Sequence, residues 1–174
     1  MKNNMVRGFI ALGALAIAPA CTSAPLPAAR AAGLERLDHC AGTTGDGVAL
    51  LRSTKVLSID PMYSHVLTAS NGSENRVDGA KLLVQPPKGI SPEQMDRLLE
   101  CHSAAVLLGQ VDGSAIPNDP YWLPNSWVNI DVKPQGANFA VTLTADSIRE
   151  NLQVLRHAKN YAEEHQLAVE PPLE

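Results

Sequence analysis

The sequence predicts a small α+β domain in which two main helices pack on one face of a small antiparallel or mixed sheet. Of the 174 residues, 45% are hydrophobic and 18% are charged, which is typical of one globular domain. From residue 80 onward the hydrophobic pattern changes in the order strand, helix, strand, strand, helix. That order predicts a split βαβ unit with a hairpin and a second helix.

A short helix is expected near the start of the domain. Leu34, Leu37 and Cys40 recur at helical spacing within residues 30–41. Gly42 then ends the pattern, as a glycine in the left-handed cap of a helix does. The glycine-rich residues that follow predict a flexible connection, because they lack the Gly-Lys-Ser/Thr ending of a phosphate loop.

Extended segments are expected next. Residues 48–60 and 63–69 predict additional N-terminal strands. Asp78-Gly79 is a typical turn dipeptide before the following strand. Residues 80–85 alternate apolar and polar side chains, which predicts a strand with one buried face.

The clearest helix starts at residue 92. Ser91 is a suitable N-cap residue, Pro92 suits the first helical position, and Gln94 completes a capping box. Gly109 provides the stop signal. We therefore expect a helix of about four turns between these signals.

Two more strands and a second long helix complete the pattern. Residues 127–133 and 139–143 alternate and are joined by a hairpin loop. Asp146 is expected to cap the last helix. The core-facing stripe of this helix is expected to consist of Ile148, Leu152, Leu155 and Ala162. The whole order is similar to the ferredoxin-like sandwich without its last strand. The sheet edge that this last strand would occupy is available to an N-terminal strand.

Residues 1–20 contain the three parts of a secretory signal peptide. Lys2 and Arg7 give a positive start, and residues 8–18 form an apolar run that is too short to span a bilayer. Small residues follow this run. We therefore expect export, and cleavage after residue 20 changes the formal net charge from −4 to −6.

The residues that end this segment resemble the lipobox of bacterial lipoproteins. Ala18, Pro19 and Ala20 are small residues that lead into Cys21. The resemblance implies that Cys21 carries the lipid and anchors the chain on the periplasmic face of a bacterial membrane. Thr22 after the cysteine favours the outer membrane. The alternative is an ordinary signal-peptidase site that leaves Cys21 unmodified.

The chain is expected to have four parts. Residues 1–20 form the signal peptide, and residues 21–32 form a Pro/Ala-rich tether in which two prolines favour extended backbone. Residues 33–168 form the single α+β domain, and residues 169–174 form a tail.

Two cysteines remain once Cys21 is set aside. In an oxidising periplasm, the pair Cys40 and Cys101 is most simply a disulfide. Such a bond would link the N-terminal helix to the helix that starts at residue 92. Two separate buried thiols are the alternative.

A metal or redox site is a further alternative for these cysteines. His39 is adjacent to Cys40 and His102 is adjacent to Cys101, so the four residues form a candidate Cys₂His₂ set for zinc or copper. Neighbouring residues on a helix do not face each other, and they chelate poorly. We therefore predict no cofactor, with zinc or copper as the alternative.

His102 falls on the apolar face of its helix. A histidine in this position must find a hydrogen-bond partner or lose its charge. We expect a hydrogen-bonded core histidine. The alternative is a ligand or proton-transfer residue in a pocket beneath the helix.

Three of the seven aromatic residues lie in one loop. Tyr121, Trp122 and Trp127 stand beside Asn and Asp residues there, and they could bind a sugar, a peptide or a partner surface. The alternative is that the rings fold back over the sheet edge.

These features predict an exported, lipid-anchored envelope protein that acts as a binding or accessory module of unknown ligand. The alternative is a periplasmic metal-binding or redox protein that uses Cys40, Cys101 and His102. The membrane is the expected partner through the lipid, and an envelope protein is a candidate partner. The mildly acidic chain has no electrostatic reason to bind nucleic acid. An enzyme is not favoured, because no G-x-S-x-G or H-E-x-x-H motif occurs.

Overall fold

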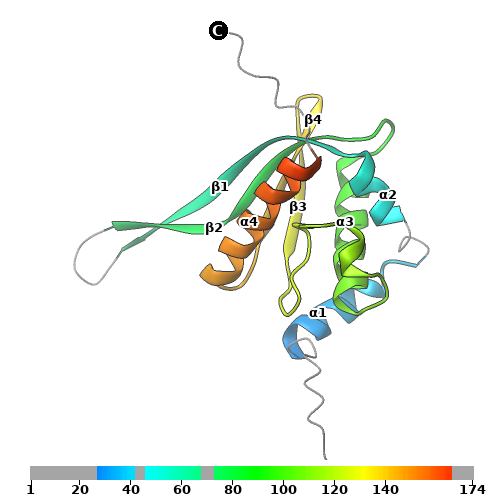
Figure 1. Ribbon diagram of the computed structural model, residues 1–174, viewed down its shortest axis with the longest axis horizontal. Helices are drawn as coiled ribbons and strands as arrows, with labels where there is room; N and C mark the ends of the chain where they lie inside the picture. Colours follow the sequence, from blue (N-terminus) through cyan, green and yellow to red (C-terminus); the bar gives the residue numbers. More distant parts are fainter. Residues whose placement is uncertain (1–26, 42–45, 68–72, 166–174) are drawn as a thin grey trace, which may run out of the picture.

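The computed structural model describes residues 27–41, 46–67 and 73–165, which form four α-helices, one 3₁₀ helix and a four-stranded sheet (Figure 1). The predicted signal peptide, Cys21 and the tail at 169–174 lie outside the described residues. The elements are α1 (Pro27–Leu37), α2 (Asp46–Ser53), β1 (Lys55–Leu67), β2 (Ser73–Gln85), α3 (Pro92–Leu107), η1 (Gly113–Ala115), β3 (Asn129–Gln135), β4 (Asn138–Thr144) and α4 (Ile148–His165).

The sheet has the strand order β1-β2-β4-β3, and every neighbouring pair is antiparallel. β2 and β3 therefore run parallel to each other with β4 between them, and α3 connects them. This is the split βαβ unit that the sequence predicts. β1 occupies the edge beside β2, where a ferredoxin-like sandwich has its last strand, so the order is compatible with that arrangement.

One hydrophobic core lies between the sheet and the two long helices. This single cluster contains buried side chains of the strands and of both helices, so α3 and α4 cover the same face of the sheet. This confirms the α+β class. Its members include Leu82 and Val84 of β2, Val141 and Leu143 of β4, Met95 and Leu99 of α3, and Val154 of α4.

The start of α3 has the predicted capping box. The Ser91 hydroxyl accepts a hydrogen bond from the Gln94 backbone N–H at 3.2 Å, and the Gln94 side chain accepts one from the Ser91 N–H at 3.0 Å. Pro92 is the first helical residue. Gly109, with φ of 74°, adopts the left-handed conformation just beyond the helix end.

The predicted tether is too long, because α1 begins at Pro27 and includes residues 27–32. Four of these residues are alanines, which have the highest helix propensity. A proline at the first helical position costs nothing, since its missing N–H would be unpaired there. Pro27 was expected to favour extended backbone, but it is the first residue of α1.

The strand predicted from residue 48 is also wrong, because residues 46–53 form α2. A short apolar run does not separate a strand from a buried helix by periodicity. Here Leu50 and Leu51 are both buried, and the helix packs beside α3. The extended segment begins only at Lys55.

The Asp78-Gly79 pair forms a bulge inside β2, where a turn was expected. In the register with β1, Met62 pairs with Gly79 and Tyr63 with Val77, so Asp78 is the additional residue. Gly79 has φ of 144°, and a Cβ there would lie 2.1 Å from a β4 carbonyl oxygen. Glycine is required at this position because β4 approaches the backbone so closely.

Ser147, not Asp146, caps α4. The Ser147 hydroxyl accepts from the Glu150 N–H at 3.3 Å, and the Glu150 carboxylate accepts from the Ser147 N–H at 3.0 Å. This is a second capping box, with serine at the N-cap and glutamate three residues later. The helix therefore starts one residue later than the aspartate cap implied.

The face of α4 that meets the core only partly overlaps the predicted stripe. Of that stripe, Leu155 and Ala162 are partly buried against the core, whereas Ile148 is 45% and Leu152 is 49% exposed. The fully buried residues of α4 include Val154, Ala158 and Tyr161. The predicted stripe and the buried face are both apolar, so periodicity cannot choose between them. The contact with β2 decides which one is covered (Figure 1).

β1 and β2 form a long hairpin that reaches beyond the rest of the sheet (Figure 1). β4 pairs with β2 only from Ala80 to Val84. The outer half of the hairpin is therefore a two-stranded ribbon.

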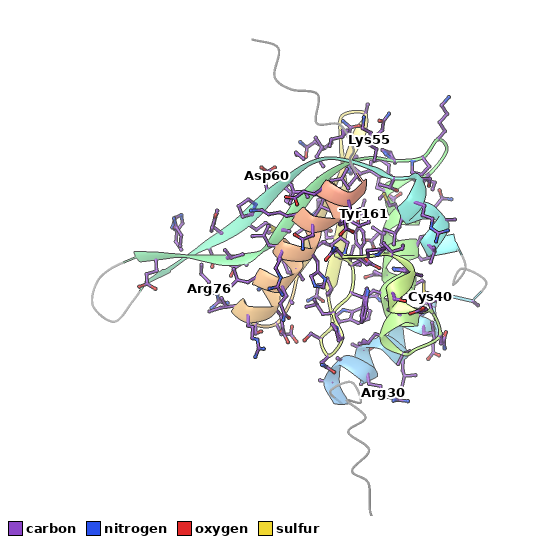
Figure 2. The ribbon with its side chains drawn as sticks, viewed as in Figure 1. Arg30, Cys40, Lys55, Asp60, Arg76 and Tyr161 are labelled. Carbon is purple, nitrogen blue, oxygen red and sulfur yellow. A yellow bond between two sulfur atoms is a disulfide. The ribbon has the colours of Figure 1, made fainter. Side chains whose placement is uncertain are left out.

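The predicted disulfide joins Cys40, just after α1, to Cys101 in the middle of α3. The two Cα atoms are 5.6 Å apart, and both residues are buried (Figure 2 labels Cys40). Beside it, the Arg36 guanidinium pairs with the Glu100 carboxylate at 2.9 Å. The disulfide thus attaches α1 to the body of the domain.

We expect the double substitution Cys40→Ser/Cys101→Ser to lower the free energy of unfolding by about 4 kcal/mol, because the bond closes a long loop in the unfolded chain. Urea denaturation of the oxidised protein and the variant measures this difference. Cys21→Ser is the matched control and should leave it unchanged. A wild-type protein equally stable with and without reductant would contradict the prediction.

Candidate functional site

A buried hydrogen bond joins α3 to the loop before β3. His102 Nε2 lies 2.5 Å from Asp119 Oδ2, and the two side chains are only 2% and 1% exposed. The other carboxylate oxygen of Asp119 accepts the backbone N–H of Tyr121 at 2.9 Å. Burial without these partners would cost several kcal/mol, so the pair satisfies the polar groups that the sequence places in the core.

The other side of the His102 ring is covered by α2. A Cβ at Gly47 would lie 2.6 Å from the Cβ of His102, so only glycine allows α2 to approach this closely. Nδ1 of His102 is buried and has no hydrogen-bond partner among the described residues. His102 is therefore a core histidine, as expected, and it lines none of the hollows described below.

Sequence reasoning missed Asp119 as the partner. It identified His102 from its place on the helix, but Asp119 stands in a loop 17 residues later with no pattern that points to α3. The only available signal was that a histidine on an apolar face needs an acceptor nearby.

One of the three loop aromatics belongs to the core. Tyr121 is fully buried, and burial raises the pKa of its hydroxyl well above the usual range. The expectation of a three-ring binding loop is therefore wrong for Tyr121, because its ring is part of the core. Trp122 is half-buried and packs over the η1 turn, where a Cβ at Gly113 would lie 2.4 Å from the indole ring.

A second tyrosine closes the core at α4. The Tyr161 hydroxyl donates to the Leu51 carbonyl at 3.0 Å, and burial raises the pKa of Tyr161 to about 12. Both buried tyrosines thus stay protonated at neutral pH. His157, from the same helix, has Nδ1 3.3 Å from the Asp119 carbonyl oxygen.

Trp127 is also half-buried, and unlike Trp122 it lines an open groove. Three neighbouring hollows of about 430, 170 and 320 Å³ form this groove. The first two share Asn125, Ser126 and Glu150, and the second and third share Ala32 and Trp127. Trp127 therefore lies near the middle. We call the whole feature the Trp127 groove; its lining residues come from α1, residues 123–129 and the region where α4 starts.

Polar side chains line the three hollows together with Trp127. Amide groups come from Asn125, Asn129 and Gln153, and hydroxyl groups come from Ser126 and Ser147. Apart from Trp127, Leu123 is the one large apolar residue among the side chains that line these three hollows. The groove can therefore offer one aromatic face and many hydrogen bonds.

Acidic residues outnumber basic ones in the groove. Arg36 is already paired with Glu100 outside the groove, and the Ser126 hydroxyl donates to Glu150. That hydrogen bond lowers the pKa of Glu150, so this group is a carboxylate at neutral pH. The charged residues that line the groove are Glu35, Asp146, Glu150, Arg36 and Arg149.

The candidate metal ligands do not form a metal centre. Cys40 and Cys101 are bonded to each other, so neither provides a thiolate. His39 is exposed and lines the Trp127 groove, while His102 is buried against Asp119. Within the described ranges, no three His, Cys, Asp or Glu side chains are arranged to hold a metal ion.

The described helices also include none that is long and apolar enough to cross a membrane.

Comparison with known proteins finds no match: no family model, no curated protein and no solved structure is significantly similar to this chain.

We expect Asp119→Ala to lower the free energy of unfolding by about 3–5 kcal/mol, because it leaves His102 buried without its partner. Asp119→Asn should cost less, since its amide oxygen still accepts the Tyr121 N–H. The double variant His102→Ala/Asp119→Ala should lose less than the sum of the single losses. Chemical denaturation of the four proteins tests this coupling, and strictly additive losses would show that the two side chains do not act as a pair.

Proposed function

We propose that this chain is an exported, lipid-anchored envelope protein that acts as a binding module, with the Trp127 groove as its ligand site. The observation that carries the binding role is the groove itself, in which one half-buried indole stands among amide and hydroxyl groups. Such a surface offers a ligand one rigid aromatic face and many directional hydrogen bonds.

A binding role fits better than a catalytic one. The buried His102–Asp119 pair lines none of the three hollows of the groove, so it does not face a ligand there. A general base must lie within hydrogen-bond reach of the group that it deprotonates. The groove supplies recognition groups instead.

The proposed anchor would hold the groove close to a membrane. α1, which forms one wall, begins six residues after Cys21. Six residues span at most about 20 Å when fully extended. A lipid on Cys21 therefore supports a site that works near the bilayer surface, on the periplasmic side and with the outer membrane favoured. An envelope component is the candidate partner.

The lipid anchor predicts that a labelled fatty acid supplied to a producing bacterium is incorporated into the chain. Cys21→Ser should abolish the label and release the protein from the membrane fraction, because the thiol is the attachment point. Cys40→Ser/Cys101→Ser is the matched cysteine control and should keep the label. An unlabelled wild-type chain would remove the anchor from the proposal.

The ligand site predicts that Trp127 responds to a ligand and Trp122 does not. Since the chain has two tryptophans, Trp122→Phe and Trp127→Phe each leave one fluorescent indole. A panel of saccharides, peptides and lipid headgroups should change the emission of Trp122→Phe with at least one class and leave that of Trp127→Phe unchanged. No response of Trp127 to any class would overturn the binding role.

A further inference from the structure

We propose that the ligand of the Trp127 groove is an uncharged oligosaccharide. This inference rests on the proposed function, because it names the ligand class of the same site. Three properties of the groove carry it: the single aromatic face, the set of planar hydrogen-bonding groups around it, and the row of connected hollows.

The aromatic face suits a sugar ring. A pyranose has one or two faces made of C–H groups, and these pack on the electron-rich face of an aromatic ring, while its hydroxyl groups point outward from the edge. Trp127 is half-buried, so its indole is supported by the protein and still reaches two hollows of the groove. An indole gives a large, rigid contact surface of this kind.

The polar groups suit the hydroxyl groups at the edge of the sugar ring. Asn125 and Asn129 lie on either side of Trp127 in the sequence, and Gln153 lines the far hollow. Each carboxamide offers both a donor and an acceptor, which matches neighbouring hydroxyl groups that also do both. The Glu150 carboxylate and the Arg149 guanidinium add one acceptor and one set of donors in the same hollow.

The charges of the groove argue against an anionic ligand. Glu35, Asp146 and Glu150 outnumber the basic residues that line the groove, and one of those, Arg36, is already engaged by Glu100. A phosphorylated or polyanionic ligand would need a cluster of basic groups, as such ligands do elsewhere. The arginines that line the groove are Arg36 and Arg149, and the acidic residues Glu35 and Glu150 are their sequence neighbours.

The shape favours several sugar units over one. The three hollows share residues from one to the next, so they form a continuous path from the start of α4 past Trp127 to α1. A peptide ligand would be expected to anchor apolar side chains in well-packed pockets. The large apolar residues that line this groove are Trp127 and Leu123, so a peptide fits the groove less well than an oligosaccharide does.

The test is a titration of the full chain, purified in detergent, with uncharged tetrasaccharides. The probes are the β-1,4-linked tetramer of N-acetylglucosamine and the α-1,4-linked tetramer of glucose, with a galacturonate tetramer as the anionic comparison. Fluorescence of Trp122→Phe and calorimetry of the wild type report binding. We expect at least one uncharged tetramer to bind at least tenfold more tightly than its monosaccharide and than the galacturonate tetramer.

The variants separate a sugar site from a general loss of structure. Trp127→Ala should weaken binding at least tenfold, Trp127→Phe should weaken it less, and Asn129→Ala should weaken it while leaving the thermal melting unchanged. Trp122→Phe is the matched control, since Trp122 packs over Gly113, and it should bind as the wild type does. A tetramer that binds Trp127→Ala as tightly as the wild type would overturn the proposal.

Two sources of such a saccharide are distinguished by a sedimentation assay. Binding to isolated cell-wall sacculi, lost in Trp127→Ala, would identify the wall glycan, and binding to lipopolysaccharide micelles would identify a lipid-linked glycan. If peptides alone change Trp127 emission, the saccharide inference fails while the binding role stands. If no ligand class changes it, both fail.

Discussion

The hydrogen bond between His102 and Asp119 is the interaction on which the candidate site depends. It ties the middle of α3 to the loop before β3, and that loop continues to Trp127. The preceding residue of α3, Cys101, is bonded to Cys40 at the end of α1. Two consecutive residues of one helix therefore hold both the loop wall and the α1 wall of the groove.

This arrangement fixes the position of the loop. The pair is almost fully buried, so its hydrogen bonds are protected from water and contribute to a unique packing of the loop. Removing one partner would leave the other buried and unpaired. The disulfide adds a covalent restraint at the same place. The disulfide and the hydrogen bond thus restrain two walls of the proposed binding groove.

Much of the fold could be predicted from the residues, because local signals agreed with the final packing. The capping box at Ser91 and the stop at Gly109 placed α3, and the strand patterns placed β3 and β4. Errors arose where two structures satisfied the same pattern. Residues 46–53 form a helix where a strand was expected. Gly79 lies in a bulge where a turn was expected, and β4 passes too close to it for any side chain. α4 turned a partly different apolar face to the core.

The candidate site was predictable only in its parts. The sequence by itself determined that His102 stands on an apolar helix face and that aromatic residues gather before β3, and it favoured a Cys40–Cys101 pair, since composition and spacing are local properties. The tertiary structure alone decided that Asp119 meets His102, that Tyr121 is covered, and that Trp127 stays half-open between α1 and α4. Which groups meet across a core depends on how the helices pack, and no local pattern encodes that contact.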